Sequence, residues 1–113
     1  MKEFICTSTE PIVQTRAGKI RGYKLGSTSH FLGVKYADAK RFEMPRPVQP
    51  WEGVKDALNY GYICPCIRDV GINDHIRVPH RFWPQNEDCQ YLNIWTQSID
   101  PTAKKAVMVW IHG

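Results

Sequence analysis

The sequence VMVWIHG at residues 107–113 decides the fold class. Its first five residues are apolar without interruption, whereas a strand with one solvated face would alternate apolar and polar residues. A continuous run of this kind is typical of a strand that is buried on both faces, as in a parallel sheet covered by helices. The stretch therefore predicts an α/β fold in which residues 106–111 form a central strand.

Such a strand needs neighbouring strands and covering helices, yet the 113 residues contain no long amphipathic helix. We therefore expect the chain to be an incomplete part of a larger fold, with residues 1–113 as the N-terminal segment of one domain. If the chain is isolated, its bare apolar end is expected to associate.

Shorter patterns predict antiparallel strands before this point. Residues 12–16 and 19–25 flank a turn at Gly18 and predict a hairpin, and residues 30–36 predict a third strand in the same sheet. Residues 53–60 hold either a short strand or a helical turn.

Two later segments complete the predicted sheet. Residues 91–96 alternate apolar and polar positions, and a short polar turn separates them from residues 106–111. Because strands joined by a short turn usually lie side by side, these two are expected to pair antiparallel. Trp51, Trp95 and Trp110 are expected in the core.

The charge pattern argues against two classes of partner. The net charge is +4, and the basic residues form no stripe, which speaks against nucleic-acid binding. The longest apolar run has five residues, far short of a membrane span. The first residues lack the apolar core of a signal peptide, so we expect a cytoplasmic location, or secretion if the true N-terminus lies upstream.

The four cysteines leave two alternatives open. An even number of cysteines fits a disulfide framework in an oxidising compartment. Cys64 and Cys66, followed by His75 and His80, also resemble a metal site, but zinc sites place two to four residues between paired cysteines and here there is one. We therefore expect no metal, and unpaired thiols at Cys6 and Cys66.

Several motifs in collinear order identify a family. They are FLGVKYA at 31–37, PWEGV at 50–54, EDCQYLNIW at 87–95 and VMVWIHG at 107–113, preceded by GKIRG at 18–22. The chain resembles the N-terminal part of type-B carboxylesterases, the group that includes cholinesterases and bacterial para-nitrobenzyl esterases. The resemblance implies an α/β-hydrolase fold, of which this chain supplies antiparallel edge strands and the first strands of the central sheet. Lys35 departs from the family pattern, which usually has proline there, and Gln90 stands where leucine is usual.

The resemblance implies hydrolysis of a small-molecule carboxylic ester through a Ser-His-Asp/Glu triad and an acyl-enzyme, without a cofactor. The serines of this chain lie outside any Gly-x-Ser-x-Gly motif, so it holds no catalytic residue and is expected to be inactive alone. His112 and Gly113 match the start of the oxyanion loop, where we expect the segment to be truncated; in the family the donating amides belong to later glycines. The alternatives are a non-catalytic cholinesterase-like binding or adhesion protein and a free-standing binding module. The oligomeric state stays open.

The resemblance also implies two structural pairs. Cys64 and Cys89 match the family's first disulfide, although a reducing compartment would keep them as thiols. Arg41 and Glu87 match a partly buried salt bridge that pins the same loop. Trp83, six residues before Cys89, is interpreted as loop packing rather than as a ligand for quaternary ammonium.

Overall fold

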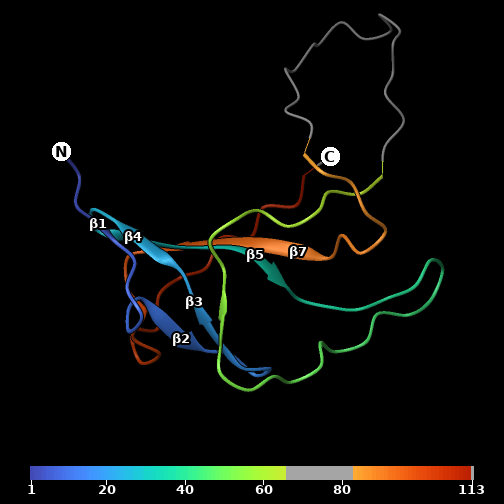
Figure 1. Ribbon diagram of the computed structural model, residues 1–113, viewed down its shortest axis with the longest axis horizontal. Coiled ribbons are helices and arrows are strands. Elements are labelled where there is room, and N and C mark those ends of the chain that lie inside the picture. The colour runs from blue at the N-terminus through green and yellow to red at the C-terminus, as the bar shows by residue number, and fades with distance from the viewer. Residues whose placement is uncertain (66–82, 113) are drawn as a thin grey trace, which may run out of the picture.

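The computed structural model describes residues 1–65 and 83–112, and this part of the chain contains strands but no helix (Figure 1). The predicted α/β class is therefore represented here by its strands alone. Within the described residues the strands form two sheets, one in the order β1-β4-β5-β7 and one in the order β2-β3-β6. The strands are β1 (Phe4–Ile5), β2 (Ile12–Gln14), β3 (Lys19–Arg21), β4 (Tyr23–Leu25), β5 (Thr28–Lys35), β6 (Val54–Asp56) and β7 (Tyr91–Thr96).

The predicted N-terminal hairpin is confirmed as β2 and β3, which pair antiparallel with Val13 opposite Ile20. The predicted continuous strand over residues 19–25 is wrong, because the chain leaves one sheet at Gly22 and enters the other as β4. The backbones cross closely at this point, since a Cβ atom on Gly22 would lie 2.1 Å from the carbonyl oxygen of His30. A residue with a side chain does not fit there, and glycine allows the change of sheet.

β5 is the strand on which the larger sheet is built. It pairs antiparallel with β4 on one side and with β7 on the other, which confirms the strands predicted near residues 30–36 and 91–96. The prediction that the first of these shares a sheet with the N-terminal hairpin is wrong, because β2 and β3 belong to the other sheet. The register shifts between Phe31 and Val34, where Gly33 adopts a φ of 63°. The side chain of Asn93 on β7 accepts the Gly33 amide at 2.9 Å, so the irregular position keeps a hydrogen bond.

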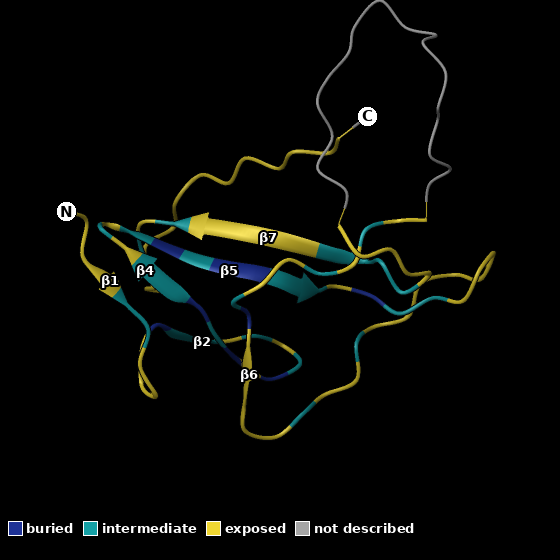
Figure 2. Cartoon of the chain, turned by 45° about the horizontal axis from the view of Figure 1, so that its top comes forward, coloured by how far each residue is buried: buried dark blue, intermediate teal, exposed yellow. Residues whose placement is uncertain are grey.

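The core lies where the two sheets meet. Phe31 of β5 is 2% exposed and packs with Ile20 of β3 and with Ala57, just after β6, with Trp51 at the edge of the cluster. Figure 2 shows buried positions along β5, with others in the segments around it. Full burial of a phenylalanine contributes about 2–3 kcal/mol.

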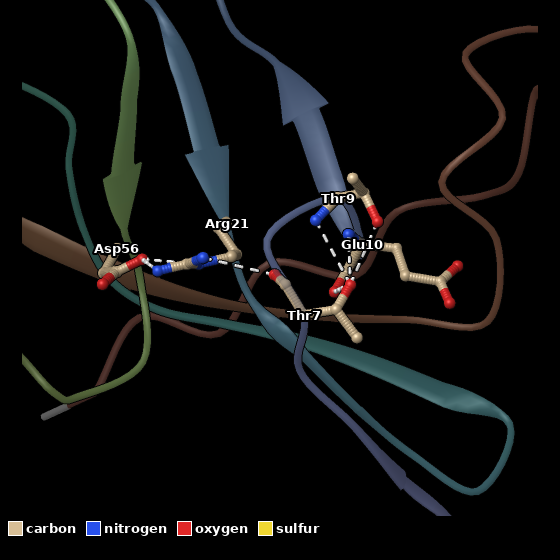
Figure 3. A network of polar contacts seen from close by, with 5 residues as sticks. All are labelled: Thr7, Thr9, Glu10, Arg21 and Asp56. Atoms are coloured by element: carbon tan, nitrogen blue, oxygen red, sulfur yellow. Dashed lines mark hydrogen bonds and ion pairs between the residues drawn. The ribbon is translucent and has the colours of Figure 1, made fainter.

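A polar network ties the N-terminal segment to the smaller sheet (Figure 3). β3 and β6 run parallel with Arg21 opposite Asp56, and the Arg21 Nε donates to Asp56 Oδ1 at 2.7 Å. Arg21 Nη1 also donates to the carbonyl oxygen of Thr7 at 3.2 Å, while the Thr7 hydroxyl oxygen accepts the Glu10 amide at 3.0 Å. Arg21 thus joins three segments that are far apart in the sequence.

The prediction that residues 106–111 form a buried strand paired with β7 is wrong for this chain. The segment has no strand conformation, and its apolar residues from Val107 to Ile111 are 75% to 93% exposed. Trp95 and Trp110 are likewise 54% and 86% exposed rather than in the core. The physical reason is that burial needs partners, and no strand among the described residues lies beside this segment.

Alanine at Gly33 is expected to destabilise the chain more than alanine at Gly53. Both glycines have left-handed φ angles, of 63° and 74°, which cost a non-glycine residue roughly 1 kcal/mol. A Cβ on Gly33 would also lie 2.3 Å from the carbonyl oxygen of Asn59, whereas a Cβ on Gly53 meets nothing within 4 Å. We expect about 3 kcal/mol for Gly33→Ala against ~1 kcal/mol for Gly53→Ala, measured by urea unfolding. Equal losses would contradict this packing.

The exposed apolar residues 107–111 are expected to make the isolated chain self-associate. Val109→Asp, which places a charge in the middle of this run, should shift the chain toward the monomer in light scattering coupled to size exclusion. Gln49→Asp, at an exposed position outside the run, adds the same charge and serves as the control. Monomeric behaviour of the unmodified chain would count against the expectation.

Candidate functional site

Four of the residues that the sequence singled out lie at the base of the segment that runs from Cys64 to Cys89: the two cysteines themselves, Arg41 and Glu87. Two backbone hydrogen bonds close this base, from the Ile63 amide to the Pro84 carbonyl and from the Asn86 amide to the Ile63 carbonyl, both at 3.1 Å. β5 and the residues after it border the base on one side, because the Tyr36 amide donates to the Gln90 carbonyl at 3.1 Å. The backbone at Ile63 and the backbone at residues 84–86 are therefore hydrogen-bonded to each other at this base.

Arg41 and Glu87 form a two-pronged ion pair. Arg41 Nε donates to Glu87 Oε2 at 3.3 Å, and Arg41 Nη2 contacts Glu87 Oε1. The Arg41 hydrogen bonds hold the pKa of Glu87 below its ordinary value. The side chains are 65% and 56% exposed, so the predicted partial burial is wrong: Arg41 lies on a proline-rich stretch that runs out into solvent. Because solvent screens the two charges, such a pair orients the two side chains but contributes little to the free energy of unfolding.

The structure brings the two predicted disulfide partners together as thiols. In the described part of the chain Cys64 and Cys89 are both free, with Cys64 exposed and Cys89 half-buried. Burial, followed by the neighbouring Cys64, raises the pKa of the Cys89 thiol. The disulfide itself stays a prediction.

An ionic cluster next to these residues was missed by the sequence reasoning. Lys35, at the end of β5, contacts Asp38 and lies 2.9 Å from Asp88 Oδ1. The Tyr91 hydroxyl donates to Asp88 Oδ2 at 3.2 Å. The hydrogen bond to Asp38, and then the contacts with Asp88, raise the pKa of the Lys35 ammonium. The signal was present in the sequence, because Lys35 is the position where the family pattern has proline.

Trp83 packs on the other arm of the segment. Its indole N–H donates to the Tyr60 carbonyl at 3.3 Å, and the two rings meet edge to face at 5.8 Å between centroids. The side chain is 43% exposed. These contacts agree with the interpretation of Trp83 as loop packing.

The remaining candidates are placed as follows. His112 is exposed, while Gly113 and the possible metal ligands Cys66, His75 and His80 lie outside the described residues. Among residues 1–65 and 83–112, no group of three His, Cys, Asp or Glu side chains could hold a metal ion. The same part of the chain has no helix long and apolar enough to cross a membrane.

Comparison with known proteins identifies the family. The sequence profile described as the carboxylesterase family matches residues 9–113. The chain belongs to the carboxylesterase family. Carboxylesterase 3B of Mus musculus is 38% identical over 97% of this chain, and para-nitrobenzyl esterase of Bacillus subtilis strain 168 is 37% identical over 93%. The type-B carboxylesterase resemblance is thereby confirmed.

A solved esterase shares the backbone of this carboxylesterase segment. An esterase from the anaerobic Clostridium hathewayi superimposes on the whole chain with a TM-score of 0.86 at 51% identity. The chain spans 22% of that esterase, and 22% and 21% of the two relatives above. The chain therefore corresponds to about a fifth of that esterase.

Cys64 is expected to react with iodoacetamide faster than Cys89 at pH 8. Only the thiolate reacts, and burial both shields Cys89 and raises its pKa, whereas Cys64 is exposed. Mass spectrometry of the alkylated peptides at successive times measures both rates. In urea the two rates should converge, since the difference depends on the fold; faster alkylation of Cys89 in the folded chain would contradict this placement.

The raised pKa of the Cys89 thiol also makes the stability of the folded chain depend on pH. Because folding raises the pKa of Cys89, the protonated thiol contributes fully to the free energy of unfolding below the pKa of the unfolded thiol. This contribution is lost as the pH rises through the pKa of the folded thiol.

Proposed function

We propose that this chain is the scaffold segment of a carboxylic ester hydrolase that works through a serine nucleophile, a histidine base, an orienting carboxylate and an acyl-enzyme. The observation that carries the proposal is the family match over residues 9–113, together with 51% identity to an esterase along the whole chain. The relatives compared above bear esterase names, which favours an enzyme over the adhesion protein considered as the alternative.

The chain's part in this reaction is to position rather than to react. None of its serines lies in a Gly-x-Ser-x-Gly turn, so the nucleophile comes from elsewhere in the enzyme. His112 and Gly113 lead into the oxyanion loop, whose amides stabilise the developing negative charge. Loss of one such donor costs about 3–4 kcal/mol of transition-state stabilisation, so the placement of this loop is a catalytic requirement.

The substrate class follows from the same reasoning. Acylation of a serine by a triad needs a carbonyl carbon with a leaving group, which in a carboxylic ester is the alcohol, and no cofactor takes part. The Clostridium hathewayi relative is described as able to hydrolyse aliphatic aromatic polyesters, and the Bacillus subtilis relative as a para-nitrobenzyl esterase. Both descriptions support esters with an aromatic component as the first substrates to try.

The purified 113-residue chain is expected to hydrolyse para-nitrophenyl acetate no faster than buffer, because it has no nucleophile elbow. Residues 1–113 grafted in place of the matching segment of the Clostridium hathewayi esterase should give an active chimera, within about tenfold of the parent, which corresponds to ~1.4 kcal/mol of activation free energy.

Two controls make the graft informative. The parent esterase lacking the segment should be inactive, and the chimera with its elbow serine changed to alanine should lose turnover. A folded chimera without serine-dependent activity would refute the proposal that this segment serves an ester hydrolase.

A further inference from the structure

Lys35 holds two carboxylates that come from distant parts of the chain. Its ammonium contacts Asp38, three residues later, and lies 2.9 Å from Asp88 Oδ1 and 3.1 Å from Asp88 Oδ2. The Lys35 side chain is only 25% exposed, compared with 65% for Arg41 in the neighbouring ion pair. Because solvent screens a half-buried pair less than an exposed one, Lys35 is the stronger of the two anchors.

The anchored residue lies directly before Cys89. Asp88 belongs to a tight turn in which its amide donates to the Asn86 side-chain oxygen at 2.9 Å and the Cys89 amide donates to the Glu87 carbonyl at 3.0 Å. These two hydrogen bonds place the Asp88 carboxylate and the Cys89 backbone in one turn. The Tyr91 hydroxyl adds a hydrogen bond to the same carboxylate.

We propose that Lys35 is a positioning residue for Cys89: by holding Asp88 at the end of β5, it keeps the turn over residues 87–89 where the Cys89 thiol meets Cys64. A proline, which the resemblance implies at this position, carries no cation and would leave Asp88 without this contact. The proposal rests on the ion-pair geometry and holds whether or not the proposed hydrolase activity is correct.

Removing the ammonium should displace the turn for a physical reason. Asp38 and Asp88 share one cation, and without it two carboxylates face each other across the same space. The two carboxylates would then repel each other, and we expect the turn over residues 87–89 to move away from Asp38.

The test measures how strongly the fold favours the pairing of the two thiols. The chain, with Cys6→Ser and Cys66→Ser to remove the other thiols, is equilibrated with reduced and oxidised glutathione. The Cys64 or Cys89 thiolate attacks oxidised glutathione and releases one glutathione thiol. The second cysteine then attacks the mixed disulfide, forms the protein disulfide and releases the other glutathione thiol. The equilibrium constant gives the effective concentration of one cysteine at the other.

Lys35→Met should lower this effective concentration about threefold, the size expected for a half-exposed ion pair. Lys35→Arg, which keeps the cation, should restore it. Asp88→Asn should lower it by a similar factor, and the combination with Lys35→Met should lower it no further. Lys105→Met, which removes an exposed lysine, should leave it unchanged.

Two results would overturn the proposal. The first is the same effective concentration in Lys35→Met and in the unsubstituted chain, including the case in which all variants show the low value of an unfolded polypeptide. The second is an equal fall in Lys35→Met, Lys35→Arg and Lys105→Met, which would indicate a general loss of structure instead of the loss of one charge contact. Since the readout is a thiol equilibrium, failure of the esterase chimera would leave it unaffected.

Discussion

The burial of Phe31 between the two sheets is the contact on which the rest of this chain depends. Phe31 is the largest fully buried side chain in the described residues, and it connects β5 to Ile20 of β3 and to Ala57 beyond β6. The amide of the next residue, Leu32, donates to the Ala57 carbonyl at 2.8 Å, so the apolar contact and the backbone contact reinforce each other. Without this junction the two sheets would share little apolar area, and small sheets alone are marginally stable.

Close backbone approach is the condition that lets the junction form. Gly22 passes against the His30 carbonyl and Gly33 against the Asn59 carbonyl, and a Cβ atom would overlap these oxygens at 2.1 Å and 2.3 Å. Gly22 also lies against the Phe31 ring, while Gly33 follows Phe31 by two residues within β5. The fold therefore combines the large side chain of Phe31 with two glycines at which the backbones approach closely. Such close approach is consistent with the dense packing of protein interiors.

The sequence predicted the elements whose pattern is local. The hairpin around Gly18 and the alternating stretch near residues 91–96 carry their own signal, and both are found. β1 and β4, with two and three residues, are too short to show a period, and the change of sheet at Gly22 depends on a contact with His30 that no local pattern contains.

The errors have a common cause. The run over residues 107–111 and the side chains of Trp95 and Trp110 were expected to be buried because they are apolar. An apolar side chain is buried only where a second surface covers it, and these side chains are exposed. The Arg41–Glu87 pair was expected from the family resemblance, whereas the departure at Lys35 marked that position without indicating its partner Asp88, 53 positions away.

The contacts of the segment before and within β7 hold that segment against β5 and the residues that follow β5. Glu87 is held by Arg41, Asp88 by Lys35 and Asn93 by the Gly33 amide, so three side chains fasten this segment to β5 and to the residues that follow it. Each contact alone is weak because it is partly exposed. Together they hold one stretch of backbone at residues 87, 88 and 93. A stretch that is held at three points keeps its position relative to β5, and a preorganised site needs such fixed positions in its scaffold.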